Sequence, residues 1–188
     1  HELKLLGFLG IKIHPDYQST FFDDEGYVRI VKAAKSEGLA VVTHAGVDAA
    51  YIGEPIRCSP DRVLRLLDRV GGYEKLVLAH YGGNKIFDEV FEKLAGEDVY
   101  FDTSYVLRFL DKTTFARILE KHGEDRILFG SDSPWSDIKE NVEKIKNVIV
   151  YEMKRSATII EAKGIFLSEE KELIICLVHY RQFSDFLI

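Results

Sequence analysis

Short apolar runs alternate with amphipathic segments along most of the chain. Apolar runs bounded by polar residues are typical of buried strands, whereas the segments between them place apolar residues at the i, i+3, i+4 spacing of a helix. Such alternation predicts repeated β-α units around a parallel sheet. The five apolar runs are Phe8–Ile13, Leu39–Thr43, Leu76–Ala79, Val99–Phe101 and Ile127–Phe129.

Polar residues at the right positions predict the starts of four helices between these runs. Side chains of Ser, Asp and Asn accept hydrogen bonds from the N–H groups of a first helical turn. The expected caps are Asp23 or Asp24, Ser59 followed by Pro60, Asn84, and Asp111. Gly123 can end the last of these helices. His122, in its last turn, is expected to be a cation favoured by the helix dipole, without a functional role.

Each apolar run ends close to a His or an Asp. The strand ends near His14, His44, His80, Asp102 and Asp132 are separated by 30, 36, 22 and 30 residues. A (β/α)8 barrel averages about 31 residues per unit and carries its functional groups just past the carboxyl ends of its strands. We therefore predict an α/β fold, a partial TIM barrel made of the last five β-α units. About three more units are expected to precede the first residue.

Beyond the last apolar run the pattern changes. Ser136 is expected to cap a further helix. Two β-rich runs, 158–167 and 172–180, are joined by a short charged turn, which predicts a hairpin. The sequence thus predicts two regions: residues 1–142 as the C-terminal portion of the barrel, and residues 143–188 as a small, incomplete α+β segment.

Composition narrows the classes of partner. With 25 Lys and Arg against 31 Asp and Glu, the net charge is -6, which argues against nucleic acid as a partner. Cys58 and Cys176 form no CxxC pair, so neither a disulfide framework nor a thiolate metal site is indicated, and a cytoplasmic location fits. No apolar stretch is long enough to cross a bilayer, so we expect no membrane partner. The expected partner is a small-molecule substrate.

The polar groups at the five strand ends form the candidate site, because parallel strands bring their carboxyl ends to one face of a barrel. Two or more imidazoles with a carboxylate suit Zn²⁺, which would lower the pKa of a bound water and polarise a substrate carbonyl. His80 or Asp132 could move the proton. Gly46, Gly82 and Gly83 are expected to leave room for a ligand. The set comprises Lys12, His14, His44, His80, Asp102 and Asp132.

Several candidates have an ordinary structural explanation beside the functional one. Lys12 shares strand parity with His14 and would point inward, where it could neutralise a substrate carboxylate or pair with a neighbouring acid. His14 precedes a proline and could simply leave the strand. Asp102 could cap a turn, and Trp135 could line the cavity mouth or pack as an aromatic. Lys12, His14 and Trp135 are the candidates for substrate binding.

Five motifs occur in order at barrel spacing: GIKIHPDYQ, VVTHAG, LAHYGG, YFDTS and RILFGSDSPW. Over about residues 5–140 they resemble the metal-dependent amidohydrolase superfamily, in the branch that contains aminocarboxymuconate-semialdehyde decarboxylase. The resemblance implies that His44 and Asp132 bind the metal and that His80 serves in proton transfer. The first strand of that family carries a His-x-His pair of metal ligands, and this sequence contains no such pair.

The same resemblance implies a metal-dependent hydrolase that acts on a small carbonyl- or carboxylate-bearing substrate through a metal-activated water. A decarboxylase on the same site is the alternative. Residues 146–188 resemble the start of the cytosolic domain of YitT-type bacterial proteins, which would make the chain a non-catalytic regulatory or ligand-binding module. Open strands at the two edges of a partial barrel also predict self-association into a homo-oligomer.

Overall fold

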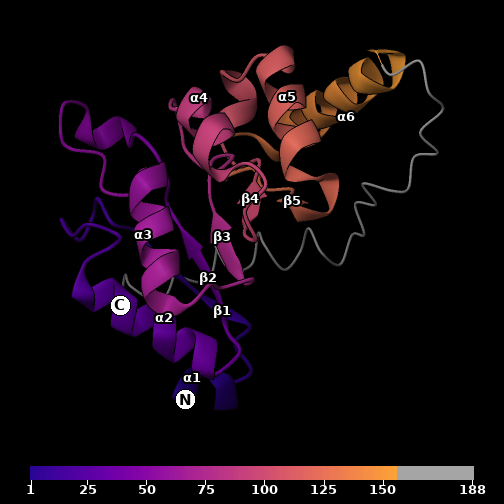
Figure 1. The fold of residues 1–188 in the computed structure, drawn as a ribbon. Helices are drawn as coiled ribbons and strands as arrows, with labels where there is room; N and C mark the ends of the chain where they lie inside the picture. Colours follow the sequence, from indigo (N-terminus) through magenta and orange to yellow (C-terminus); the bar gives the residue numbers. More distant parts are fainter. Residues whose placement is uncertain (156–188) are drawn as a thin grey trace.

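Five short strands form one parallel sheet in which each strand pairs with its neighbours in sequence (Figure 1). The computed structural model describes residues 1–155, and the side chains of residues 1–147. The order along the sheet is β1-β2-β3-β4-β5, which confirms the predicted α/β fold and the five predicted strands. Their bounds are β1 (Gly10–Ile13), β2 (Ala40–Thr43), β3 (Leu76–Leu78), β4 (Tyr100–Asp102) and β5 (Ile127–Leu128).

Helices follow each strand and separate it from the next. The longer ones are α2 (Glu25–Ser36), α3 (Pro60–Val70), α5 (Lys112–His122) and α6 (Ile138–Arg155). The segment before β4 consists of a single turn, α4 (Phe87–Glu89), that continues as a π-helix, η2 (Val90–Leu94). Short elements complete the described chain: α1 (Glu2–Leu5), η1 (Ala49–Tyr51), η3 (Val106–Arg108) and η4 (Glu124–Arg126).

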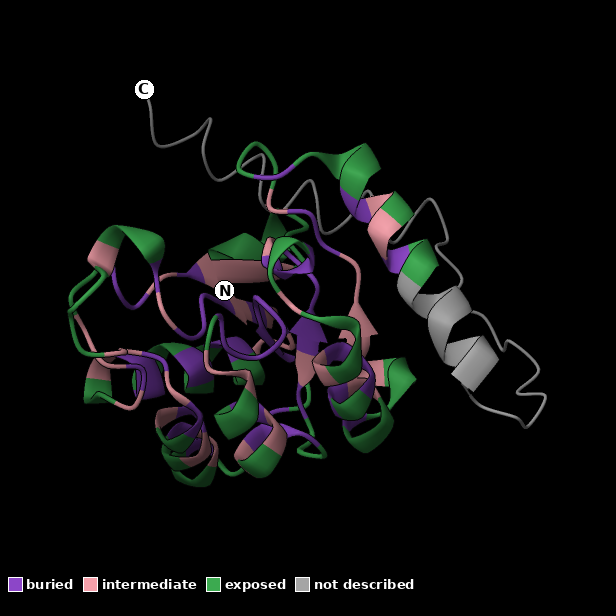
Figure 2. Ribbon diagram, turned by 90° about the horizontal axis from the view of Figure 1, so that it is seen from above, coloured by how far each residue is buried: buried purple, intermediate pink, exposed green. Residues whose placement is uncertain are grey.

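The core lies between the sheet and this layer of helices. The apolar residues of α2 and α3 recur at helical spacing, and those facing the sheet are buried, among them Tyr27, Val31, Val63 and Leu66. Seen from above, buried positions gather between the strands and the helices, while exposed positions face outward (Figure 2). Burial of this apolar stripe holds each helix against its strand.

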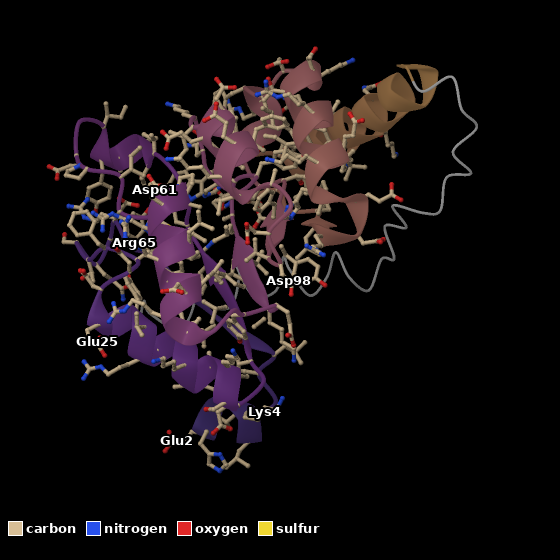
Figure 3. All side chains as sticks on the ribbon, in the orientation of Figure 1. Glu2, Lys4, Glu25, Asp61, Arg65 and Asp98 are labelled. Carbon is tan, nitrogen blue, oxygen red and sulfur yellow. The ribbon has the colours of Figure 1, made fainter. Side chains whose placement is uncertain are left out.

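Charged residues occupy the outer surfaces of α2 and α3. Glu25, Asp61 and Arg65 are exposed on this side of the molecule (Figure 3). The two helices are also joined at their ends, because Lys35 Nζ donates hydrogen bonds to the carbonyls of Gly71 and Gly72 at 2.9 and 2.7 Å. These contacts fix α3 beside α2 at the edge of the molecule that is opposite the carboxyl ends of the strands.

The predicted helix starts are confirmed in part. Asp111 Oδ1 accepts hydrogen bonds from two N–H groups in the first turn of α5, as expected. Asp24 and Ser59 precede α2 and α3, although neither side chain caps the helix that follows it. The prediction that Ser136 caps α6 is wrong, because it is Asp137 that accepts a hydrogen bond from a first-turn N–H group.

Gly46 is required by a close approach of two backbone segments. Its φ is 87°, and it forms an isolated parallel bridge with Asn84. A Cβ at Gly46 would lie 2.2 Å from Asn84 N, and one at Gly82 would lie 2.8 Å from the Phe101 ring. The prediction that these glycines leave room for a ligand is therefore wrong, since protein atoms already fill that space. Asn84 holds this loop by donating to the carbonyl of Val47 and does not cap α4.

The predicted boundary at residue 142 falls inside α6, which continues without interruption from Ile138 to Arg155. The division into 1–142 and 143–188 stays a prediction. The expected hairpin of 158–167 and 172–180 lies outside the described residues. Within the part of the chain that the structure describes, no helix combines the length and apolar character that a bilayer span requires.

Candidate active site

A cavity of about 650 Å³ opens at the carboxyl ends of the strands. Parallel strands deliver their last residues to the same edge of a sheet. His14 and His44 directly follow β1 and β2, His80 follows β3 by two residues, and Asp132 follows β5 by four. Of the seven candidate residues, Asp102 is not among those that line the cavity, and the other six line it: Lys12, His14, His44, His80, Asp132 and Trp135.

His80 and His44 form a hydrogen-bonded pair at the centre of the site. His80 Nε2 lies 2.9 Å from His44 Nδ1, and His80 Nδ1 lies 2.9 Å from the carbonyl oxygen of Ser104. A carbonyl can only accept, so Nδ1 of His80 carries a proton, and with the His80 imidazole neutral its Nε2 accepts from His44 Nδ1. His44 Nε2 is left with a lone pair, and this atom is buried without a hydrogen-bond partner.

Asp102 fixes the backbone around His80. One carboxylate oxygen, Oδ1, accepts from the backbone N–H groups of His80 and Ser104, both at 3.0 Å, and from the Ser104 hydroxyl. His80 has a φ of 62°, a left-handed conformation that a residue with a side chain adopts at a cost. Asp102 thus binds the backbone of the turn that follows it, as its structural explanation expects, and its hydrogen bond to the His80 N–H also holds His80 in place.

His14 lies between two other rings on the β1 side of the cavity. It stacks on Tyr17 with ring centroids 3.8 Å apart, and on His44 with centroids 4.5 Å apart. His14 Nε2 is 3.3 Å from Asp48 Oδ2, and His44 Nε2 is 3.8 Å from Asp16 Oδ2. His14 therefore does not simply leave the strand, because its ring is enclosed by the site.

Burial keeps the two stacked imidazoles neutral. It lowers the pKa of His14 to about 3, and the charges of Lys12 and His80 act in the same direction. Burial also lowers the pKa of His44, reinforced by His80 and His14. A neutral imidazole is the form that binds a metal. Both rings can therefore act as ligands at neutral pH.

Lys12 and Asp16 are buried groups whose pKa values shift toward their neutral forms. Burial lowers the pKa of Lys12, while the charges of Asp102 and Asp132 oppose the shift. Burial raises the pKa of Asp16, and Arg57, 3.5 Å from its Oδ1, opposes that shift. Lys12 thus lies near two acids, Asp102 and Asp132, as the pairing explanation expects, and it also lines the cavity that a substrate carboxylate would enter.

Asp132 and Trp135 form the wall that follows β5. The charge of Asp132 acts on both Lys12 and Tyr17, so it faces the same space as the β1 side. The side chain of Trp135 is 62% exposed, which places it at the rim of the cavity and excludes packing in the core. Arg108 donates to the Trp135 carbonyl at 3.4 Å and lines the cavity beside it.

The donor set fits a divalent cation. Among the described residues, one group of three His, Cys, Asp or Glu has ligand atoms that all lie within 4.8 Å of one another, and it consists of His14, His44 and Asp48. Imidazole nitrogen and carboxylate oxygen are ligands of Zn²⁺ and of related first-row ions. The buried lone pair of His44 Nε2 supports the same conclusion, because a buried polar atom without a partner is costly.

Several residues of the site are absent from the sequence-based set. Asp16 and Tyr17 follow His14 in the HPDYQ segment, Asp48 follows the second strand by five residues, and Ser104 follows Asp102. Their proximity to predicted site residues in the sequence was the available signal. It is a weak signal, since a loop residue can turn either toward the cavity or away from it.

The fold and the cavity together define a partial (β/α)8-barrel protein with a His- and Asp-lined site at the carboxyl ends of its strands. The chain belongs to the amidohydrolase family, whose family model matches residues 1–161. This match confirms the resemblance of the barrel portion and extends into the region assigned to the tail. The comparisons lend no support to the YitT-type resemblance, which falls largely outside the described residues. No curated protein matches the chain significantly.

Solved structures show the same fold at low identity. A dihydroxybenzoic acid decarboxylase from Polaromonas, with bound manganese and 2-nitroresorcinol, is similar at 17% identity and a TM-score of 0.56, covering 96% of this chain and 63% of that one. A candidate 2-pyrone-4,6-dicarboxylic acid hydrolase from Pseudomonas putida has 18% identity, a TM-score of 0.54, and coverages of 78% and 58%. A zinc-bound amidohydrolase from Burkholderia multivorans has 17% identity and a TM-score of 0.50, and the match covers 73% of this chain and 52% of that one. The chain spans less than two thirds of each.

Proposed function

We propose that the chain carries the metal site of an amidohydrolase-type hydrolase acting on a small carbonyl- or carboxylate-bearing substrate. The observation that carries the proposal is the convergence of His44, His80 and Asp132, from the ends of three different strands, on one cavity. The unpartnered Nε2 of His44 supports a cation at this point. Membership of the amidohydrolase family supports the reaction class.

The residues would divide the work as follows. His44 and Asp132 would hold a divalent metal, Zn²⁺ in our first choice, which when bound polarises a carbonyl and lowers the pKa of a water. His80 would take up and return a proton at Nε2, in exchange for the hydrogen bond that this atom accepts from His44 Nδ1, since the Ser104 carbonyl occupies its Nδ1. Asp132 could share this proton transfer.

Lys12, His14 and Trp135 would contact the substrate. Lys12 lies in the cavity wall and, in its protonated form, would pair with a substrate carboxylate. Trp135, exposed at the rim, would cover a bound ring or carbonyl group and exclude water from it. A substrate of this kind is small, because the cavity holds about 650 Å³.

Decarboxylation is the second candidate reaction. The cavity is lined by two basic side chains, Lys12 and Arg108, which suit a carboxylate-bearing substrate in either reaction. A decarboxylase is among the structural neighbours, although at 17% identity this likeness concerns the fold. A regulatory module defined by residues 143–188 and a cytoplasmic location stay predictions, as do a small-molecule partner and the absence of nucleic-acid and membrane partners.

Metal binding and product analysis test the proposal on the full chain. We expect one equivalent of Zn²⁺ or Mn²⁺ per chain in equilibrium dialysis, and about tenfold or greater weakening in His44→Gln, because a ligand is removed. His1→Gln, which changes an exposed histidine far from the cavity, is the control. A wild-type chain that binds neither ion, or binds equally well without His44, would overturn the metal site.

The reaction class is tested with two probes, 2-pyrone-4,6-dicarboxylate and a dihydroxybenzoate, chosen because neighbouring structures carry those names. Ring opening with uptake of water indicates hydrolysis, and release of CO₂ indicates decarboxylation. We expect the first from the metal-loaded chain, with loss of at least a hundredfold in His80→Gln, since a positioned proton-transfer group contributes 10²–10⁴ in rate. CO₂ release alone would replace the hydrolase by the second candidate.

A further inference from the structure

The β1 side of the cavity contains a set of donors that the proposed ligands His44 and Asp132 do not use. The rings of His14 and His44 are nearly parallel, with an interplanar angle of 19° and centroids 4.5 Å apart. One ligand atom from each ring and one from Asp48 lie within 4.8 Å of one another. Ligands that share one metal at about 2.1 Å lie roughly 3.0–3.6 Å apart, so small side-chain rotations would bring all three onto one ion.

His14 and Asp48 are already at the spacing of two ligands of one ion. His14 Nε2 lies 3.3 Å from Asp48 Oδ2, yet the pair is not aligned as a hydrogen bond. The other oxygen of Asp48 accepts the Ala50 N–H at 2.7 Å, which fixes the carboxylate and leaves Oδ2 turned to the imidazole. Two ligand atoms that both point toward a metal ion lie close together without being aligned as a hydrogen bond, and His14 Nε2 and Asp48 Oδ2 have this arrangement.

A second observation points to a cation independently. Two buried atoms, His44 Nε2 and Asp16 Oδ2, face each other at 3.8 Å, and neither has a hydrogen-bond partner. The hydrogen bonds of His80 place the His44 proton on Nδ1, so His44 Nε2 presents a lone pair toward Asp16. A cation beside His44 Nε2 would give this buried lone pair a partner.

We propose that His14 and Asp48 bind the divalent metal together with His44, so that the metal sits on the β1–β2 side of the cavity. This inference rests on the proposed function, because the metal is the same one. His14 and Asp48 would supply two further ligands, from the residue after β1 and from the loop after β2. Two imidazoles and a carboxylate form a common ligand set for Zn²⁺, with a further position open to Asp132 or a substrate.

One existing contact of His14 would change on metal binding. The backbone N–H of Tyr17 donates to His14 Nδ1 at 3.4 Å, a long hydrogen bond. A neutral imidazole that binds a metal through Nε2 carries its proton on Nδ1, and it then cannot accept from Tyr17. Metal binding therefore exchanges this weak contact for a metal bond, and the Tyr17 amide reports the exchange.

The test measures Zn²⁺ affinity by isothermal titration of the full, tag-free chain and of matched variants. We expect His14→Gln and Asp48→Asn to weaken Zn²⁺ binding about tenfold or more, as His44→Gln does. The controls are His1→Gln and Asp125→Asn, which change an exposed histidine and an exposed aspartate outside the cavity. Circular dichroism of each metal-free variant establishes that it folds.

The outcomes separate the two proposals. If wild type binds Zn²⁺ and only His44→Gln and Asp132→Asn weaken it, the proposed function stands and His14 and Asp48 are not ligands. If wild type binds no Zn²⁺, the metal site itself fails. NMR of the wild-type chain avoids dependence on variants that fail to fold: we expect Zn²⁺ to shift the His14 ring resonances and the Tyr17 amide, and unmoved resonances at Zn²⁺ saturation overturn the proposal.

Discussion

His122 is a buried imidazole outside the cavity whose surroundings favour its neutral form. Its ring stacks on Phe101 with centroids 3.8 Å apart and an interplanar angle of 3°, and its Nδ1 accepts the Gly96 N–H at 3.1 Å. Burial lowers its pKa to about 4, and the charge of Arg126 contributes in the same direction. The expectation of a cation at the end of α5 is therefore wrong, because burial outweighs the helix dipole.

This shift predicts a loss of stability in mild acid. In the unfolded chain His122 takes up a proton near the ordinary pKa of about 6.5, whereas in the folded chain it does so only near 4. The contribution of neutral His122 to the free energy of unfolding is therefore complete above pH 6.5 and declines as the pH falls toward 4. Between pH 7 and pH 4 the free energy of unfolding, measured with urea, should fall by up to about 3 kcal/mol more in wild type than in His122→Asn. Equal losses in both proteins would contradict this assignment.

Single residues of the site were predictable where a strand positions them. His44 directly follows a buried strand, and its placement on the cavity follows from the parallel sheet alone. Asp16 and Asp48 lie in the loops beyond, where no periodicity tells which side chains turn inward. The partner of His80 was likewise unpredictable, because it is a backbone carbonyl, that of Ser104.

At the scale of elements, the loop after β2 depends on one glycine. Gly46→Ala would place a Cβ 2.2 Å from Asn84 N at a φ of 87°. We expect a loss of roughly 3 kcal/mol in the free energy of unfolding, from the left-handed backbone and from overpacking. Gly26→Ala is the matched control, since no atom lies within 4 Å of its Cβ position and α2 tolerates alanine. A Gly46→Ala protein as stable as wild type would contradict the close approach.

Strands were easier to predict than the helices between them. Each strand lies in a short apolar run that ends close to a polar residue, which is the pattern typical of parallel strands. The segment from Phe87 to Leu94 has the apolar spacing of a helix, but it forms one α-turn and a π-helix. The hydrophobic pattern specifies which side faces the core and does not distinguish i+4 from i+5 hydrogen bonding.

For the whole molecule, the described sheet has two open edges, β1 and β5. Exposed apolar side chains precede β1, including Leu5 and Leu6, each 73% exposed. An unpaired strand beside an apolar surface favours pairing between chains. We therefore predict that the chain self-associates at micromolar concentration, as light scattering after size exclusion would show.

Substitution of this apolar segment tests the prediction. Leu5→Lys with Leu6→Lys should shift the chain toward monomer, because charged side chains beside an edge strand oppose pairing. Ile52→Lys serves as the control, since Ile52 is also 73% exposed but lies in the loop after β2. A wild-type chain that stays monomeric at all concentrations would remove the prediction.

Pairing between sequence neighbours also has a consequence for how the chain acquires its structure. Val77 pairs with Tyr100, 23 positions later, and Val41 with Leu76, 35 positions later. Each new strand thus needs to close only a short stretch of backbone onto the part already assembled, and the entropy lost in doing so grows slowly with that length. The sheet can therefore grow one unit at a time while the ribosome is still adding residues.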